Sequence, residues 1–188
     1  MKKNRMLIAL AFACGLFSYS SQAQESFKGK RTFYIVRHAE KDKGNDPAIS
    51  AIGKDRAGDL YRTLKDKKIK LIMATQYRRT GMTADSLRLY NKIDSIQYSA
   101  DATGEQFASA VRLRTGRAKN ILVVGHSNTL PALVRQLGVQ DYRVKELPES
   151  EYDNLFVVTV KNGRATLRQL KYGKLSPPQD EVKKMSLE

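Results

Sequence analysis

The sequence predicts an α/β fold: a three-layer α/β/α sandwich with a mainly parallel central sheet and an antiparallel edge strand. Three observations support this prediction. Short β-branched and aliphatic runs, typical of buried strands, each end in a polar turn. Segments with apolar residues at helical spacing separate these runs, so strands and helices alternate along the chain. Asn162-Gly163, a strong two-residue hairpin signal, joins two further strand-like runs near the C-terminus.

The expected elements follow one another along the chain. A strand at 32–36 precedes a helix whose apolar residues recur at helical spacing over 57–64, with Ser50 before it as an N-cap. Further strands are expected at 70–74, 121–124, 155–161 and 164–170. Three further helices are marked by the apolar sets Thr83, Leu87 and Tyr90; Phe107, Ala110 and Val111; and Leu130, Leu133, Val134 and Leu137.

The chain divides into an expected leader, one domain and a tail. Residues 1–23 carry basic residues, then the apolar run 6–17, then a Ser-rich end, which is the pattern of a secretory signal peptide. The apolar run is shorter than the roughly 20 residues that cross a bilayer, so no transmembrane segment is expected. Residues 24–174 are expected to form one globular domain and 175–188 a loose tail. The sequence therefore predicts export, to the periplasm, with cleavage after Ala23.

The only cysteine, Cys14, lies in the expected leader. Once the leader is removed, the protein can form no disulfide, no thiolate metal site and no cysteine nucleophile. Cys14 could instead be the lipid anchor of a lipoprotein. Phe12 stands where a lipoprotein signal has a small or aliphatic residue, and this favours simple cleavage over anchoring.

The chain is strongly basic, with 34 Lys and Arg against 19 Asp and Glu and a net charge of +15. Such a field attracts phosphorylated small molecules and polyanions without choosing among them. Basic and aromatic residues are not interleaved and no nucleic-acid-binding motif is present, so no nucleic acid partner is expected. The sequence also lacks a phosphate-binding Gly-x-x-x-x-Gly-Lys loop and a His cluster with metal-ligand spacing. Neither a cofactor nor a metal is expected.

Both histidines of the chain directly follow expected strands. His38 comes after Arg37 at the end of the first strand, and His126 follows Gly125 at the end of the strand 121–124. Ligands of open α/β sheets bind outside the carboxyl ends of the strands. Arginine binds phosphate oxygens bidentately, and a neutral imidazole is a competent nucleophile near pH 7. Two histidines at such positions, one beside an arginine, therefore indicate a phosphate site.

Three motifs carry a resemblance to a known family, and they occur in its order over about residues 31–160. They are Val36-Arg37-His38-Ala39-Glu40-Lys41, Arg79-Thr80-x-x-Thr83-Ala84 and Gly125-His126-Ser127-Asn128-Thr129. The chain resembles the histidine phosphatase superfamily, also called the phosphoglycerate mutase-like fold, and within it a small, single-domain, SixA-like member. The resemblance implies a metal-independent phosphoric monoester hydrolase. It also implies that His38 attacks phosphorus to form a phosphohistidine, while Arg37, Arg79 and His126 hold the phosphoryl oxygens.

The proton donor for the leaving group is left open. One branch of the family has an acid directly after the second histidine, where this chain has Ser127. Another branch has a Glu between the second arginine motif and the second histidine, and Glu105 or Asp101 is the available candidate. Glu105 could equally complement the dipole in the first turn of a helix. If neither acid reaches the site, substrates with good leaving groups are favoured.

Three further residues are candidates for substrate binding. Ser127 and Asn128 can donate to phosphate oxygens, although an N-cap role of Asn128 or Thr129 for the following helix is an equal alternative. Glu40 is a motif residue that is expected to support the pocket. Arg56 matches the family pattern, but it is also read as a solvated helix residue.

The sequence thus predicts an exported phosphomonoester hydrolase that acts on small organic phosphates, with a phosphorylated small molecule or inorganic phosphate as its partner. The short stretch between Arg79 and His126 leaves no room for a large cap domain, so the pocket is expected to be open. A phosphohistidine protein phosphatase and a non-catalytic phosphate- or polyanion-binding protein with the same fold are the alternatives. The oligomeric state is not indicated.

Overall fold

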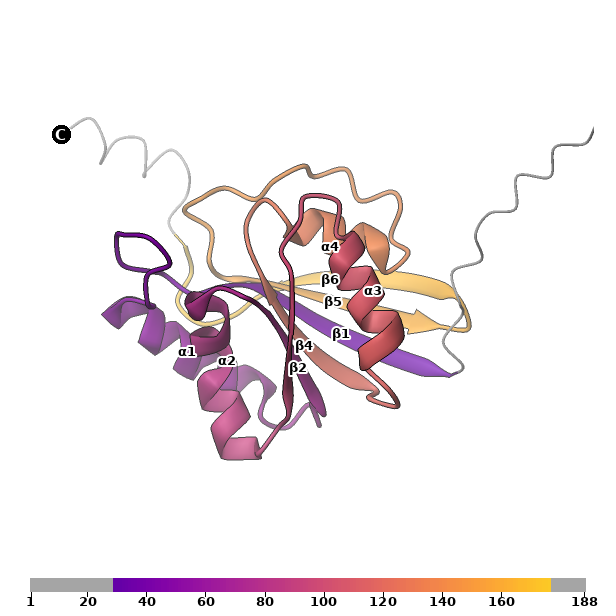
Figure 1. The fold of residues 1–188 in the computed structure, drawn as a ribbon, viewed down its shortest axis with the longest axis horizontal. Helices are drawn as coiled ribbons and strands as arrows, with labels where there is room; N and C mark the ends of the chain where they lie inside the picture. The colour runs from indigo at the N-terminus through magenta and orange to yellow at the C-terminus, as the bar shows by residue number, and fades with distance from the viewer. Residues whose placement is uncertain (1–28, 177–188) are drawn as a thin grey trace, which may run out of the picture.

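The computed structural model describes residues 29–176, which form a six-stranded mixed sheet with helices on both faces (Figure 1). Neighbouring strands run in the order β3-β2-β4-β1-β5-β6. The strands are β1 (Lys30–Arg37), β2 (Leu71–Thr75), β3 (Ser95–Tyr98), β4 (Asn120–Gly125), β5 (Asn154–Lys161) and β6 (Arg164–Lys171). The helices are α1 (Ala51–Leu64), α2 (Arg78–Asn91), α3 (Glu105–Arg114) and α4 (Leu130–Gln136).

The two central strands, β1 and β4, are buried on both faces and pair in parallel, with Ile35 opposite Val123. Pairing continues in parallel through β2 to β3, whereas β5 is antiparallel to β1 and β6 is antiparallel to β5. Buried parallel strands read as nearly continuous apolar runs, and this is why the sequence pattern located β1, β2 and β4. The predicted mainly parallel sheet with an antiparallel edge is confirmed.

Strand β3 was not predicted from the sequence. It has four residues, and Tyr98 is the buried one among them. A short edge strand with exposed side chains has no apolar run to mark it. Parallel pairing with β2, in which Ile96 lies opposite Met73, holds this segment as a strand.

The helices cover the sheet in two pairs, α1 and α2 on one face and α3 and α4 on the other (Figure 1). On the first face Leu60 and Leu87 pack against Leu122 and Val124. On the second face helix residues such as Phe107 join a core that includes several strand residues. Alternate residues of β4 therefore contribute to two separate cores, and the three-layer architecture is confirmed.

Two predicted capping and turn signals are confirmed. The Ser50 side chain accepts a hydrogen bond from the Gly53 backbone N–H at 3.2 Å, at the N-terminus of α1. Asn162 and Gly163 both have positive φ, 48° and 77°, in the turn between β5 and β6. Two such residues in succession are required by the type I′ turn that suits a hairpin.

Close contact fixes the loop after β1 against α1. A Cβ added at Gly53 would lie 2.1 Å from the Glu40 carbonyl oxygen, so only glycine fits there. The Ser50 backbone N–H donates to the same carbonyl oxygen at 2.8 Å. The loop that carries the Arg37-His38 motif is therefore held by the start of α1.

The expected leader, 1–23, and most of the expected tail lie outside the described residues. Ser176, near the start of that tail, donates its backbone N–H to Asp153 and accepts a hydrogen bond from the Tyr152 backbone N–H. Within 29–176 no helix is long and apolar enough to cross a membrane.

Candidate active site

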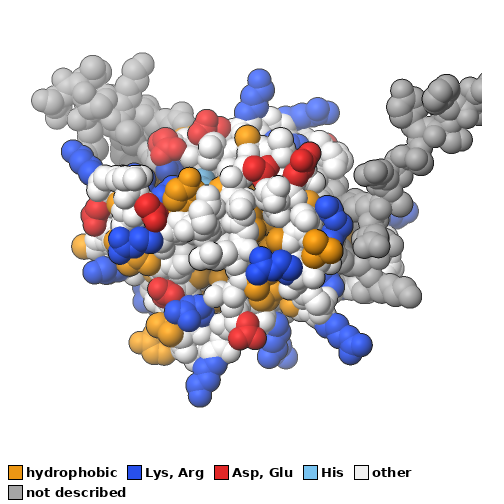
Figure 2. All heavy atoms as spheres, in the orientation of Figure 1, with side chains coloured by type: hydrophobic (Ala, Val, Ile, Leu, Met, Phe, Trp, Pro, Cys, Tyr) orange, Lys and Arg blue, Asp and Glu red, His pale blue; other side chains and the backbone are white. Residues whose placement is uncertain are grey.

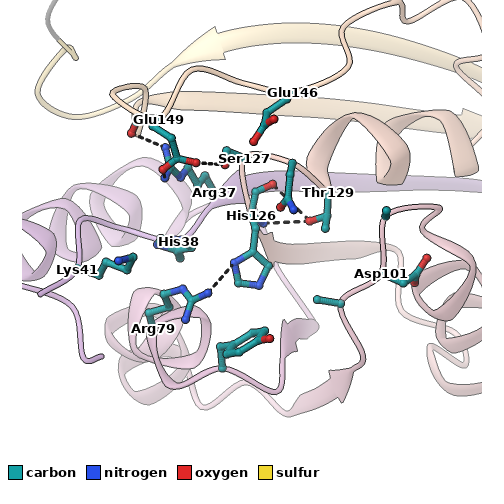
Figure 3. A pocket seen from close by; sticks show the side chains of 14 residues that line it. Arg37, His38, Lys41, Arg79, Asp101, His126, Ser127, Thr129, Glu146 and Glu149 are labelled. Carbon is teal, nitrogen blue, oxygen red and sulfur yellow. Dashed lines mark hydrogen bonds and ion pairs between the residues drawn. The ribbon is translucent and has the colours of Figure 1, made fainter. Parts of the chain in front are cut away.

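The histidines and arginines of the motifs meet at the carboxyl ends of β1, β2 and β4. Arg37 ends β1 and His38 follows it, His126 follows β4, and Arg79 lies in the first turn of α2, just after β2. All four side chains line one cavity of about 340 Å³ (Figure 3). The His38 and His126 rings have centroids 5.3 Å apart in an edge-to-face arrangement. The four residues that the motifs predicted to act together are thus brought together.

His38 is held as a neutral imidazole. Its Nδ1 lies 2.8 Å from the Ala39 carbonyl oxygen, and because a carbonyl can only accept, Nδ1 carries the proton. Burial lowers the pKa of His38 to about 3, with a contribution from the positive charge of Arg37. The Nε2 lone pair, which makes no hydrogen bond within 29–176, is therefore available to an electrophile at neutral pH.

His126 has the opposite tautomer. Arg79 Nη2 lies 3.4 Å from its Nδ1 and can only donate, so Nδ1 accepts and Nε2 carries the proton. That Nε2 donates to Thr75 Oγ1 at 3.0 Å, and Thr75 in turn bonds Thr80. Burial and the positive charges of Arg79 and Arg37 lower the pKa of His126 to about 4. Both imidazoles are therefore uncharged in the free protein at neutral pH.

The motif Arg79-Thr80-x-x-Thr83 has a structural reason for its spacing. Arg79 faces the cavity, Thr80 ends the hydrogen-bond chain from His126, and Thr83 lies one helical turn further on. The Thr83 hydroxyl donates to the Arg79 carbonyl at 2.7 Å and accepts the Ala39 backbone N–H at 2.8 Å. One helix thereby positions both Arg79 and the backbone of Ala39, the residue whose carbonyl orients His38.

The Arg79 side chain is mostly buried, and its neighbours leave part of its guanidinium open to the cavity. The Tyr77 ring lies 4.4 Å from its Cζ, and Asp46 pairs with its Nη1 at 3.5 Å. Its Nε is buried and has no hydrogen-bond partner among the described residues. A buried donor without a partner favours an anionic ligand at this place.

Arg37 is almost fully buried and is surrounded by the loop between α4 and β5. Its Nη1 donates to the carbonyl oxygens of Glu149 and Pro148, at 2.7 and 3.3 Å, and the Tyr152 ring lies 4.0 Å from its Cζ. Like that of Arg79, its Nε is buried without a partner among residues 29–176. Its Nη2 forms an ion pair with the carboxylate of Glu149.

Glu149 was not predicted from the sequence. It lines the cavity, and besides its ion pair with Arg37 it accepts the Ser127 hydroxyl at 2.6 Å (Figure 3). Partial burial raises the pKa of Glu149, but the Ser127 hydrogen bond and the Arg37 charge outweigh this effect and lower it overall. The carboxylate is therefore ionised in the free protein. No motif marked it, since it lies in an irregular loop whose course the sequence does not specify.

Two predicted site residues lie elsewhere. Glu105 is exposed at the first position of α3 and is not among the residues that line the cavity. Its position at a helix N-terminus fits the alternative role of complementing the helix dipole. Glu40 pairs with Arg56 through both oxygens at 2.7–2.8 Å instead of facing the cavity. Arg56 is buried by this pair, so its interpretation as a solvated residue was wrong.

Asp101 lines the cavity, but its carboxylate is committed to the start of α3. It accepts hydrogen bonds from the backbone N–H groups of Thr103, Glu105 and Gln106. Slight burial raises its pKa, whereas the Thr103 hydroxyl and these N–H groups outweigh burial and lower it. These hydrogen bonds hold the Asp101 carboxylate against the start of α3.

The turn after His126 also lines the cavity. Ser127 is buried, Asn128 is exposed and both face the cavity, as does Thr129. Thr129 makes no side-chain capping bond for α4; its hydroxyl accepts the His126 backbone N–H at 3.1 Å. It therefore fixes the histidine rather than capping the helix.

Within residues 29–176 no group of three or more His, Cys, Asp or Glu side chains could hold a metal ion. The cationic side chains that line the cavity are Arg37, Lys41 and Arg79. The arrangement can therefore bind an anion with arginine donors and present an uncharged imidazole nitrogen to it.

No protein-family model and no curated protein sequence matches the chain. Solved structures do resemble it. One described as the phosphohistidine phosphatase SixA from Nakamurella multipartitia is 17% identical, with a TM-score of 0.58 over 78% of this chain and 97% of its own. One described as SixA from Agrobacterium tumefaciens is 19% identical, with a TM-score of 0.56 over 76% and 97%.

A third similar structure is described as an α-ribazole-5′-P phosphatase from Escherichia coli K-12. It is 14% identical to this chain, with a TM-score of 0.61 over 79% of this chain and 99% of its own. These structures are matched over nearly their whole length, so the likeness extends across the sheet and both helical layers. The chain therefore shares the fold of these structures, in agreement with the fold that its motifs predict.

Proposed function

We propose that the protein hydrolyses phosphomonoesters through a covalent phosphohistidine at His38. The observation that carries the proposal is the pair of histidines at the sheet edge, with His38 Nε2 unprotonated and two arginines lining the same cavity. The fold shared with structures described as phosphatases supports it.

The chemistry follows from the positions of these groups. Arg37 and Arg79, each with a buried Nε that lacks a partner among the described residues, would bind the phosphoryl oxygens. His38 Nε2 would attack phosphorus in line with the ester oxygen, so that an N–P bond forms and the P–O bond breaks. Water would then attack phosphorus, break the N–P bond and release inorganic phosphate. Charge on the equatorial oxygens is stabilised by fixed cations throughout.

His126 would change its protonation on binding. Its Nδ1 is unprotonated in the free protein and cannot donate to an anion. A phosphate dianion beside it would favour the imidazolium, because an opposite charge at short range favours the charged form. The protonated ring would then donate from Nδ1 to a phosphoryl oxygen, while Nε2 keeps its bond to Thr75.

Small organic phosphates encountered outside the cytoplasm are the proposed substrates. A cavity of about 340 Å³ suits a small molecule better than a large one. The signal-peptide pattern of residues 1–23 supports export. The structures described as phosphohistidine and α-ribazole-5′-P phosphatases share one fold, so the fold does not select the substrate.

Hydrolysis of para-nitrophenyl phosphate is the direct test. We expect activity that persists with a chelator, falls by several orders of magnitude in His38→Ala, and is accompanied by an acid-labile phosphoenzyme. His126→Ala should retain measurable phosphoenzyme formation, since it keeps the nucleophile. Binding of phosphate without turnover would instead support a non-catalytic binder.

A phosphohistidine protein is the second candidate substrate, because two of the similar structures are described as phosphohistidine phosphatases. Phosphohistidine needs little protonation of its leaving group. A panel that contains a phosphohistidine-bearing protein beside small phosphate esters would separate the candidates by their ratio of kcat/KM.

A further inference from the structure

We propose that Glu149 is the general acid that protonates the leaving group, with Ser127 as its positioning residue. This inference rests on the proposed function. It assigns the proton donor that the sequence left open between Glu105 and Asp101.

Among the carboxylates that line the cavity, Glu149 is the one that is hydrogen-bonded to Arg37 and Ser127. Three carboxylates line the cavity: Asp101, Glu146 and Glu149. Asp101 is occupied by the N–H groups at the start of α3, and Glu146 makes no hydrogen bond within 29–176. Glu149 binds Ser127 with one oxygen and Arg37 with the other (Figure 3).

Two contacts hold this part of the loop beside the second histidine. The Ser127 side chain donates to Glu149, and the Ser127 carbonyl accepts the backbone N–H of Leu147 at 3.1 Å. Leu147 is buried in the core under the loop. The Glu149 side chain itself is 72% exposed, so it has room to move when an ester binds.

Substrate binding supplies the proton. In the free protein the Glu149 carboxylate is paired with Arg37. When phosphoryl oxygens take over the Arg37 guanidinium, Glu149 loses its cation and gains an anion as a neighbour, so its proton affinity rises. The second pKa of a phosphomonoester is about 6. The monoanion can therefore pass its proton to Glu149 when the ester binds as the dianion.

The charged and titratable groups that face Glu149 come from three places. They are Arg37 on β1, His38 just after it, His126 after β4 and Tyr152 on the same loop. Arg37 is the cation among them in the free protein, and it is the group that the substrate would occupy. Binding therefore changes the surroundings of Glu149 more than those of the exposed carboxylates elsewhere.

The two chemical steps balance through this carboxyl group. As His38 Nε2 bonds to phosphorus, the P–O bond breaks and the Glu149 proton goes to the leaving oxygen, which departs as an alcohol. Water then attacks phosphorus and gives a proton to the Glu149 carboxylate. The N–P bond breaks, the proton passes from Glu149 to the departing phosphate, and the ionised Glu149 pairs with Arg37 again.

The test compares esters whose leaving groups differ in their need for a proton. Glycerol phosphate releases a basic alkoxide and para-nitrophenyl phosphate a stable phenoxide. We expect Glu149→Gln to lower kcat/KM for glycerol phosphate by about 100-fold or more and that for para-nitrophenyl phosphate by less than about 10-fold. Ser127→Ala should shift the ratio in the same direction by a smaller factor.

Glu146→Gln is the matched control, because it removes the same charge from the same cavity wall without touching Ser127 or Arg37. Its ratio of alkyl to aryl activity should equal that of the unmodified protein. Equal losses on both esters in Glu149→Gln would overturn the inference while leaving the proposed function intact. A gain of activity in Glu149→Gln would also overturn it, since the carboxylate would then act only as a competitor for Arg37. If the unmodified protein hydrolyses neither ester, the proposed function fails first.

Discussion

Two histidines with opposite tautomers define the chemistry at the scale of single residues. His38 is protonated at Nδ1 because the Ala39 carbonyl can only accept, and His126 is protonated at Nε2 because Arg79, which can only donate, lies against its Nδ1. Each tautomer is set by a partner with a fixed hydrogen-bonding role rather than by the imidazole itself. Burial among cations keeps both rings uncharged.

This burial makes stability depend on pH in a predictable direction. The pKa of His126 is lowered from 6.5 to about 4 in the folded state. The unfolded chain therefore binds more protons below pH 6.5, and the contribution of this residue to stability is present above that pH and lost as pH falls toward 4. We expect the free energy of unfolding to drop by about 1 kcal/mol more in the unmodified protein than in His126→Asn between about pH 7.5 and 5.5.

Urea unfolding of both proteins at the two pH values measures this difference. The carboxylates titrate in both proteins and cancel in the comparison. An identical loss of stability in the two would show that His126 titrates in the folded state as it does in the unfolded chain.

At the scale of elements, the site depends on how helices hold the loops that follow strands. The Thr83 hydroxyl of α2 fixes the Ala39 peptide, and the start of α1 fixes the Glu40 peptide. The loop after β1 is therefore held from two helices. The pair Glu40 and Arg56 adds a buried link from this loop to the C-terminal segment, through the Lys174 carbonyl.

Two glycines of α1 should respond oppositely to substitution by alanine. At Gly53 a Cβ would lie 2.1 Å from the Glu40 carbonyl oxygen, so the helix and the loop must separate. At Gly58 the nearest atoms belong to the flexible end of Arg62, at 3.2 Å. We expect Gly53→Ala to destabilise the fold by about 2 kcal/mol or more and Gly58→Ala to stabilise it by about 0.5 kcal/mol.

Thermal or urea unfolding distinguishes the two variants, and a phosphatase assay adds a second measurement. Gly53→Ala should also lower kcat, because the displaced loop carries His38. If Gly53→Ala were as stable as Gly58→Ala, the close approach of α1 to the Glu40 peptide would be wrong.

At the scale of the whole molecule, the sheet brings together five segments that are far apart in the sequence. They are 37–41, 75–83, 100–102, 126–129 and 146–152, and they meet at the carboxyl edge of the parallel strands. Figure 2 shows many Lys and Arg side chains spread over the visible face, with Asp and Glu side chains among them. The net charge of +15 creates a field that favours approach of anions.

Added salt should therefore slow the capture of an anionic substrate and so lower kcat/KM. Raising the ionic strength from about 20 to 200 mM shortens the screening length several-fold. We expect kcat/KM for a dianionic ester to fall several-fold over this range while kcat stays nearly constant. Salt-independent kcat/KM in a steady-state assay would mean that the local arginines alone attract the substrate.

The sequence by itself predicted the layers of the fold and the four histidine and arginine residues that line the cavity together. Apolar periodicity is a local property, and both histidines follow strands whose carboxyl ends meet in any parallel sheet. Edge strand β3 was not predicted because its alternation of polar and apolar residues extends over four residues, which is too short to mark a strand. Glu105 does not line the cavity, because the order of residues along the chain does not specify which side chain at a helix N-terminus faces the site.

The tertiary structure alone decided the tautomer of His126, the burial of Arg56 and the place of Glu149. Each depends on contact between segments that are distant in sequence, such as Arg37 with Glu149 and His126 with Thr75. A loop without periodicity can place a carboxylate anywhere on the surface until packing fixes its course. Here the buried Leu147 and the hydrogen bonds of Ser127 fix that course, and they bring the Glu149 carboxylate to Arg37.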